Sequence, residues 1–149
     1  MNMRGLLGLL LASALLANGG HAKEVEVKSP QAAGRPYGQN YKDMVLAWCV
    51  ASAYPSDSMA AIDAGSSVSA LQEWTYYDME NSLQSIKELV DRYLARDYFN
   101  PLAEAEVPGL KFQFLKCLDL YHSRELQEQV GRYVLKPKRT YRQDYPPRR

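Results

Sequence analysis

The chain has 149 residues, of which 18 are basic and 17 acidic, so its formal net charge is +1. This length suits a single domain that is large enough to bury one core. The nearly balanced charge lacks the overall basic excess that is typical of nucleic-acid-binding proteins.

The first 22 residues have the three-part pattern of a secretory signal peptide. Arg4 supplies a positive charge, residues 6–16 form an almost unbroken apolar run, and Gly-His-Ala follows at residues 20–22. The run is too short for a membrane span, which needs about 20 apolar residues, and no cysteine lies at the expected cleavage point for lipid attachment. We therefore expect cleavage before Lys23, with an uncleaved membrane anchor as the alternative.

The next segment, residues 23–40, is predicted to be a loose N-terminal arm. It combines two prolines and two glycines with polar residues and shows no apolar periodicity. Such a composition does not supply enough apolar surface to offset the entropy of ordering the chain.

Two helices are predicted next. Residues 41–54 are apolar on every face, which indicates a central, buried helix, and a proline follows it. Ser56 or Asp57 is a candidate cap for a second helix, rich in small residues, that continues to about Tyr77. On this helix, burial of Asp63 is plausible, as a hydrogen-bond acceptor or, less favoured, as a general base.

Three further helices are predicted from apolar residues spaced three or four apart. Asp78 and Ser123 are candidate caps for the first and the last of them. Their apolar faces consist of Leu83, Ile86, Leu89, Val90, Tyr93 and Leu94; of Phe112, Leu115, Leu118 and Tyr121; and of Leu126, Val130, Tyr133 and Val134. The helical domain is thus predicted over residues 41–135, and the fold class is all-α, a single compact bundle of four to five helices.

The last segment, residues 136–149, is predicted to be a basic disordered tail. It carries six basic side chains and one acidic side chain, and it contains three prolines. A tail of this kind offers no folded basic face, so we expect no nucleic-acid partner.

The two cysteines, Cys49 and Cys117, both lie in the part of the chain that follows the signal. In an oxidising compartment a disulfide between them is favoured over free thiols, and it would staple the first helix to the fourth. Closing a loop of this length is worth about 4 kcal/mol in the chain-entropy model. Two buried thiols, or one catalytic thiol, are the alternatives.

The mature chain contains one histidine, His122, which argues against most enzymes. On a continuous helix Cys117 and His122 would point about 140° apart, and a disulfide would remove the thiol nucleophile. The spacing of cysteines and histidine fits no metal motif, and no phosphate loop or nucleophile elbow occurs. We therefore expect no catalytic, cofactor-binding or metal-binding residues, and no enzymatic activity.

The string Lys-Cys-Leu-Asp-Leu-Tyr-His-Ser-x-Glu-Leu over residues 116–126 is the most specific motif of the chain. It is accompanied by more generic helical elements, which are Lys42-Asp43 leading to Cys49, Ala53-Tyr54, Asp63-Ala64 and Leu89-Val90-x-x-Tyr93-Leu94. With these residues the chain resembles, from about Tyr41 to Val134, the periplasmic immunity proteins that neutralise type VI secretion peptidoglycan amidases.

The resemblance implies an all-helical periplasmic protein, often a homodimer, that binds a cognate amidase and blocks its cysteine–histidine cleft with a protruding loop. By position, that loop is residues 97–110. The partner-binding residues expected there are the apolar or polar Tyr98, Phe99, Asn100 and Leu102 and the acidic Glu104 and Glu106. Alternatively, Tyr98 and Phe99 fold back onto the bundle. The alternative function is a periplasmic inhibitor or adaptor of another envelope protein; neither function requires membrane insertion.

Overall fold

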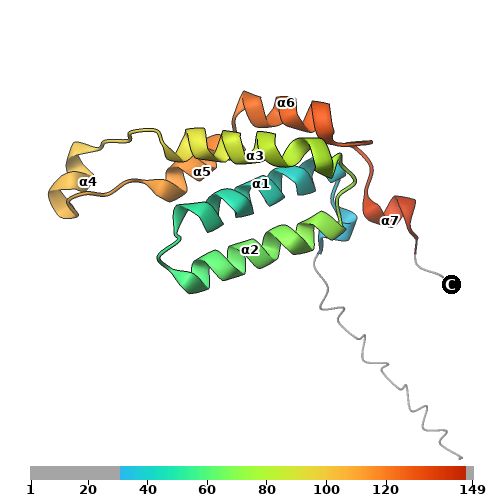
Figure 1. The fold of residues 1–149 in the computed structure, drawn as a ribbon, viewed down its shortest axis with the longest axis horizontal. Coiled ribbons are helices and arrows are strands. Elements are labelled where there is room, and N and C mark those ends of the chain that lie inside the picture. The colour runs from blue at the N-terminus through green and yellow to red at the C-terminus, as the bar shows by residue number, and fades with distance from the viewer. Residues whose placement is uncertain (1–30, 147–149) are drawn as a thin grey trace, which may run out of the picture.

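Helices account for the regular structure of residues 31–146, the part of the chain that the computed structural model describes. Their bounds are η1 Gln31–Gly34, α1 Tyr37–Ala53, α2 Ser58–Glu73, α3 Met79–Leu94, α4 Pro101–Glu106, α5 Gln113–Tyr121, α6 Arg124–Tyr133 and α7 Tyr141–Asp144. Five of them, α1, α2, α3, α5 and α6, form the bundle, while α4 and α7 are short helices outside it (Figure 1). The predicted all-α bundle is confirmed.

Helix α1 is the centre of the bundle and packs against α2, α3, α5 and α6. Tyr41, Met44, Val45 and Cys49 are completely buried along it. An apolar surface on every side is what a helix surrounded by neighbours requires. The helix begins at Tyr37, four residues before the predicted start.

The predicted disulfide joins Cys49 of α1 to Cys117 of α5, with an S–S distance of 2.01 Å. It turns the Cys117 side of α5 inward, so the buried residues of this helix are Lys116, Cys117 and Leu120. The predicted apolar face of Phe112, Leu115, Leu118 and Tyr121 is therefore wrong as a core face, and 45% of Leu115 is exposed.

Three helices begin at the predicted caps. The side chains of Asp57, Asp78 and Ser123 accept hydrogen bonds from the backbone N–H groups of Ala60, Asn81 and Leu126, which satisfies donors that a helix start leaves free.

Helix α2 ends at Glu73 rather than near Tyr77. Asn40 holds the following turn by donating to the carbonyl of Trp74 at 2.9 Å, and Tyr77 pairs with Val134 in an isolated bridge. Asp63 on α2 is exposed, so the burial that the sequence made plausible for it does not occur.

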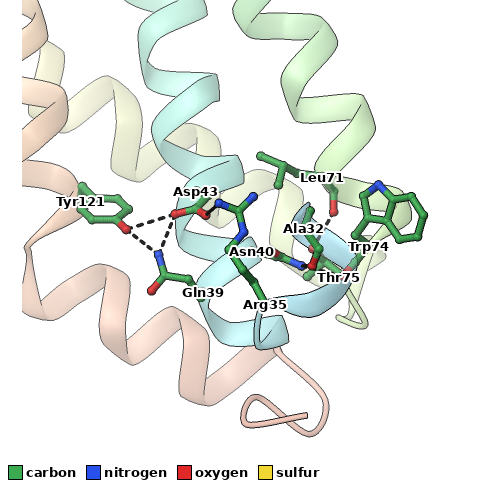
Figure 2. A network of polar contacts seen from close by, with 9 residues as sticks. All are labelled: Ala32, Arg35, Gln39, Asn40, Asp43, Leu71, Trp74, Thr75 and Tyr121. Atoms are coloured by element: carbon green, nitrogen blue, oxygen red, sulfur yellow. Dashed lines mark hydrogen bonds and ion pairs between the residues drawn. The ribbon is translucent and has the colours of Figure 1, made fainter. Parts of the chain in front are cut away.

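A polar network around Asp43 ties α1 to the η1 segment and to α5 (Figure 2). One carboxylate oxygen accepts from Gln39 Nε2 at 2.7 Å and from the Tyr121 hydroxyl at 3.1 Å, and the other pairs with Arg35 at 3.1 Å. Asp43 and Tyr121, which both belong to the sequence segments that carry the family resemblance, thus contact each other in this network. These two residues therefore hold helices together.

The segment of residues 136–146, which we call the C-terminal latch, packs onto the start of α1. The N–H groups of Tyr37 and Gly38 donate to the carbonyls of Arg139 (2.8 Å) and Pro137 (2.9 Å). Pro36, at the N-cap of α1, provides no side-chain cap, so the latch supplies the missing acceptors. The prediction of a loose N-terminal segment is wrong for residues 31–40, and the prediction of a disordered tail is wrong for residues 136–146. The predicted signal, and residues 23–30 and 147–149, lie outside the described residues.

Side chains reinforce the latch. The Tyr37 hydroxyl donates to Asp144 at 3.0 Å, and burial together with this bond raises the pKa of Tyr37 to about 12. The hydrogen bond from Arg139 holds the pKa of Asp144 below its usual range. The rings of Tyr141 and Trp74 pack edge to face with centroids 4.9 Å apart. The basic tail is therefore part of the fold as far as it is described.

Candidate functional site

Residues 97–110, which we call the arm, leave the bundle between α3 and α5 and extend at the end of the molecule opposite α7 (Figure 1). The predicted loop contains the six-residue helix α4. Asn100 begins this helix by accepting from the N–H groups of Leu102 (3.0 Å) and Ala103 (3.3 Å), and Pro101 occupies the first helical position. Asn followed by Pro is a favoured helix start.

Glu104 links α4 to the residues that follow it in the arm. Its carboxylate accepts from the backbone N–H of Gly109 at 2.9 Å. Gly109 has a φ of +79°, a left-handed conformation that glycine adopts without steric strain. Of the expected partner-binding residues, Asn100 and Glu104 therefore use their side chains to shape the arm itself.

Two of the expected partner-binding residues present apolar side chains to solvent. Phe99 is 72% exposed, and Leu102, at 81%, is the most exposed large hydrophobic side chain among the described residues. Val107 and Leu110 of the arm and Phe114 and Leu115 at the start of α5 are also exposed. Six exposed apolar side chains thus fall within residues 99–115, and a concentration of exposed apolar residues is a feature of interaction sites.

Tyr98 has different surroundings from its neighbour Phe99. It is half-buried, and its hydroxyl donates to the carboxylate of Asp119 on α5. This hydrogen bond, with burial, raises the pKa of Tyr98. Of the two alternatives for these aromatics, folding back thus describes Tyr98, and exposure describes Phe99.

The arm is acidic as well as apolar. It contains Asp97, Glu104 and Glu106 and no basic side chain. Of the two acidic side chains of α4, Glu104 is bonded to Gly109, whereas Glu106 is exposed. A pocket of about 250 Å³ lies beside the root of the arm and is lined by Tyr98, Phe99, Asn100, Phe112 and Leu115.

Sequence reasoning missed the contribution of α5 to this surface. The disulfide provided a signal for it, because a residue two positions before Cys117 points about 160° away from it on a helix. Leu115 could therefore have been assigned to the outer side of α5 once Cys117 was expected to face the core.

The histidine and the cysteine that could have formed a catalytic pair are not arranged as one. His122 is exposed at the junction of α5 and α6, and the thiol of Cys117 is held in the disulfide. Within residues 31–146, no group of three or more His, Cys, Asp or Glu side chains is arranged to hold a metal ion. In the same range, none of the helices combines the length and apolar character of a membrane span.

The chain was compared with known proteins. The model of the family described as type VI secretion system amidase immunity protein, Tai4, matches residues 39–130. A solved structure described under new type VI-secreted toxins and self-resistance proteins in Serratia marcescens is 29% identical, with a TM-score of 0.71, covering 86% of this chain and 99% of that chain. A chain from the effector–immunity system Tae4/Tai4 of Salmonella typhimurium is 25% identical, with a TM-score of 0.61, covering 70% of this chain and 96% of that chain. No curated protein matches.

Proposed function

The chain belongs to the Tai4 family of type VI secretion system amidase immunity proteins, and we propose that it binds a cognate peptidoglycan amidase and occludes that enzyme's active-site cleft with the arm. The observation that carries this proposal is the projecting arm with its exposed Phe99 and Leu102. A similar solved structure belongs to an effector–immunity system, which supports an amidase effector as the partner.

Occlusion requires shape and contact area rather than chemistry. Enzyme clefts are concave and mostly apolar, with a few polar groups, so a narrow projection that carries apolar side chains is complementary to them. Phe99 and Leu102 are the proposed anchors, since a few well-buried side chains dominate binding at most interfaces. Glu106 is the proposed partner for cations at the rim of the cleft, where charge chiefly accelerates association.

The other expected partner-binding residues have supporting roles in this proposal. Asn100 and Glu104 maintain the shape of the arm through their bonds to Leu102, Ala103 and Gly109. Tyr98 fixes the root of the arm through Asp119. Two of these three side chains, Tyr98 and Asn100, also line the pocket beside Phe99.

The proposed place of action is the periplasm, where the cell wall is exposed to an incoming amidase. The signal pattern of residues 1–22 supports export and a mature start at Lys23. The expected homodimer stays a prediction, which sedimentation of the mature protein would check.

The test is protection from lysis. The amidase is directed to the periplasm of a host cell together with this chain; we expect the neighbouring gene to encode that amidase. We expect the full chain to prevent lysis and two variants to fail: a chain lacking residues 2–22, which stays in the cytoplasm, and Leu102→Asp, which places a charge in the cleft.

The matched control is Ile62→Asp, because Ile62 is an aliphatic residue that is 63% exposed and belongs to α2 rather than to the arm. This variant is expected to protect as the wild type does. Lysis in the presence of the unaltered, exported chain would contradict the proposed function, and protection by the chain without residues 2–22 would contradict the proposed location.

A further inference from the structure

Lys116 on α5 is a buried lysine that the contact surface of the arm does not explain. Its side chain is only 5% exposed. The ammonium group donates to the carbonyl of Leu94 at 3.0 Å and to Gln113 Oε1 at 3.1 Å. Among the described residues, no carboxylate forms an ion pair with it, so this buried cation is satisfied by neutral acceptors.

A buried lysine at this position is unfavourable for the free energy of folding. Removing a charged group from water is unfavourable, and well-packed apolar residues in place of buried ionic groups are often neutral or stabilising. Leu94, however, is the last residue of α3, and the carbonyls at a helix C-terminus lack helical partners and favour a cation. Lys116 therefore ties the end of α3 to α5 immediately before the arm begins.

A second contact fixes the first residues of the arm to the same helix. The Tyr98 ring centroid lies 5.8 Å from the Lys116 ammonium, and the Tyr98 hydroxyl donates to Asp119. Lys116 and Asp119 are three residues apart and thus neighbours on the surface of α5. Together they hold Tyr98 at its ring and at its hydroxyl, while Phe99 and Leu102 beyond it remain exposed.

We propose that Lys116 is a positioning residue that fixes the direction in which the arm leaves the bundle, and so presents Phe99 and Leu102 to the amidase; this inference rests on the proposed function. A segment held in its bound orientation loses less conformational entropy on association, which raises affinity without any added contact. The charge of Lys116 thus contributes to binding through the arm, although its side chain touches no partner.

The test replaces Lys116 by Met, which retains the apolar stem and removes the ammonium group. Hydrogen exchange of the free protein is measured by residue, and affinity is measured against the purified amidase of the neighbouring gene with its catalytic cysteine replaced. We expect faster exchange in residues 94–110, unchanged exchange in α1, and affinity that is weaker by about tenfold, as for one or two side chains that must be immobilised on binding.

Tyr98→Phe is the second variant, because it removes the bond to Asp119 and leaves Lys116 in place; we expect the same direction of change. Tyr121→Phe is the matched control, since it removes a tyrosine–aspartate bond that joins α5 to α1 and not to the arm, the bond to Asp43 at 3.1 Å. We expect the control to leave both the exchange of the arm and the affinity unchanged.

Unchanged exchange of the arm in Lys116→Met would overturn the inference. Faster exchange throughout the chain with a lower melting temperature would also overturn it, because Lys116 would then act on the whole fold. The inference would also be overturned if Lys116→Met exchanged faster in the arm but bound the amidase as tightly as the wild type, while Leu102→Asp no longer bound. If instead Leu102→Asp binds normally, the proposed function itself is wrong, and the exchange data still decide the role of Lys116 in holding the arm.

Discussion

Adjacent side chains of the arm serve different purposes. Tyr98 is attached to Asp119 of α5, whereas Phe99 is largely exposed, although both are aromatic and follow one another in the sequence. Asn100 and Leu102 differ in the same way, since Asn100 accepts bonds from the start of α4 and Leu102 is 81% exposed and not part of the core. The proposed binding energy is therefore concentrated in Phe99 and Leu102.

Truncation of either anchor separates binding from stability. We expect Phe99→Ala and Leu102→Ala each to weaken amidase binding by about 2 kcal/mol or more, as buried interface anchors do, measured by titration calorimetry. The melting temperature should barely change, because both side chains are exposed in the free protein. Tyr98→Ala, in contrast, should lower both the affinity and the melting temperature. A loss of stability with preserved affinity in Phe99→Ala would place the binding surface elsewhere.

The sequence predicted the position of the arm, because a proline- and glycine-containing segment interrupts two amphipathic patterns. It could not predict which aromatic is free, since Tyr98 is held by Asp119, 21 residues further along the chain. Local turn chemistry was equally informative at Asp57, Asp78 and Ser123, whose caps depend only on the next three residues. The exposed face of α5 and the order of the C-terminal latch depend on contacts between segments that are distant in the sequence, which local patterns do not reveal.

At the scale of elements, the disulfide determines how α5 lies in the bundle. Cys117 and Leu120 are completely buried, whereas Leu115 is 45% exposed, so the covalent bond to α1 overrides the apolar pattern that predicted the opposite face. The same orientation brings Lys116 under the root of the arm. The helix that is stapled to the core thus also carries the arm's attachment.

Removal of the disulfide should be costly for the fold. We expect Cys49→Ala combined with Cys117→Ala to lower the free energy of unfolding by about 2–5 kcal/mol, the usual range for a native disulfide in a small secreted domain. Both cysteines are replaced so that no lone thiol remains. Urea unfolding of the mature protein, compared with wild type, measures the difference; an unchanged midpoint would mean that packing alone orients α5.

The C-terminal latch is an element that the composition of the tail concealed. Its backbone carbonyls at Pro137 and Arg139 bond the start of α1, and this requires no apolar periodicity in the tail itself. The proline and basic residues of the tail predicted disorder. The latch is ordered instead, because its backbone carbonyls accept hydrogen bonds from α1 and Tyr141 packs on Trp74.

Deleting residues 136–149 tests the latch. The deletion removes two backbone hydrogen bonds and the Tyr37–Asp144 side-chain bond, each worth about 1 kcal/mol, and an edge-to-face aromatic pair, worth about 0.5–1.5 kcal/mol. We expect the free energy of unfolding to fall by about 3–5 kcal/mol in urea titrations, with amidase affinity preserved at low temperature. A deletion variant as stable as the mature protein would show that the latch does not contribute to the fold.

At the scale of the whole molecule, the latch and the arm lie at opposite ends. The latch and the start of α1 close one end, and the arm projects from the other (Figure 1). Between them, α1 contacts four helices of the bundle. In the proposed function, such a division lets the arm enter a cleft while the bundle remains outside it and blocks access of the substrate.

The central claim is that the arm occludes the amidase cleft, and titration of amidase turnover with the mature protein tests it most directly. We predict that turnover of peptidoglycan fragments falls linearly to zero at one immunity chain per amidase, and that Phe99→Ala combined with Leu102→Ala abolishes the inhibition while the melting temperature stays within a few degrees. Inhibition by this double variant that equals that of the wild type would contradict the account.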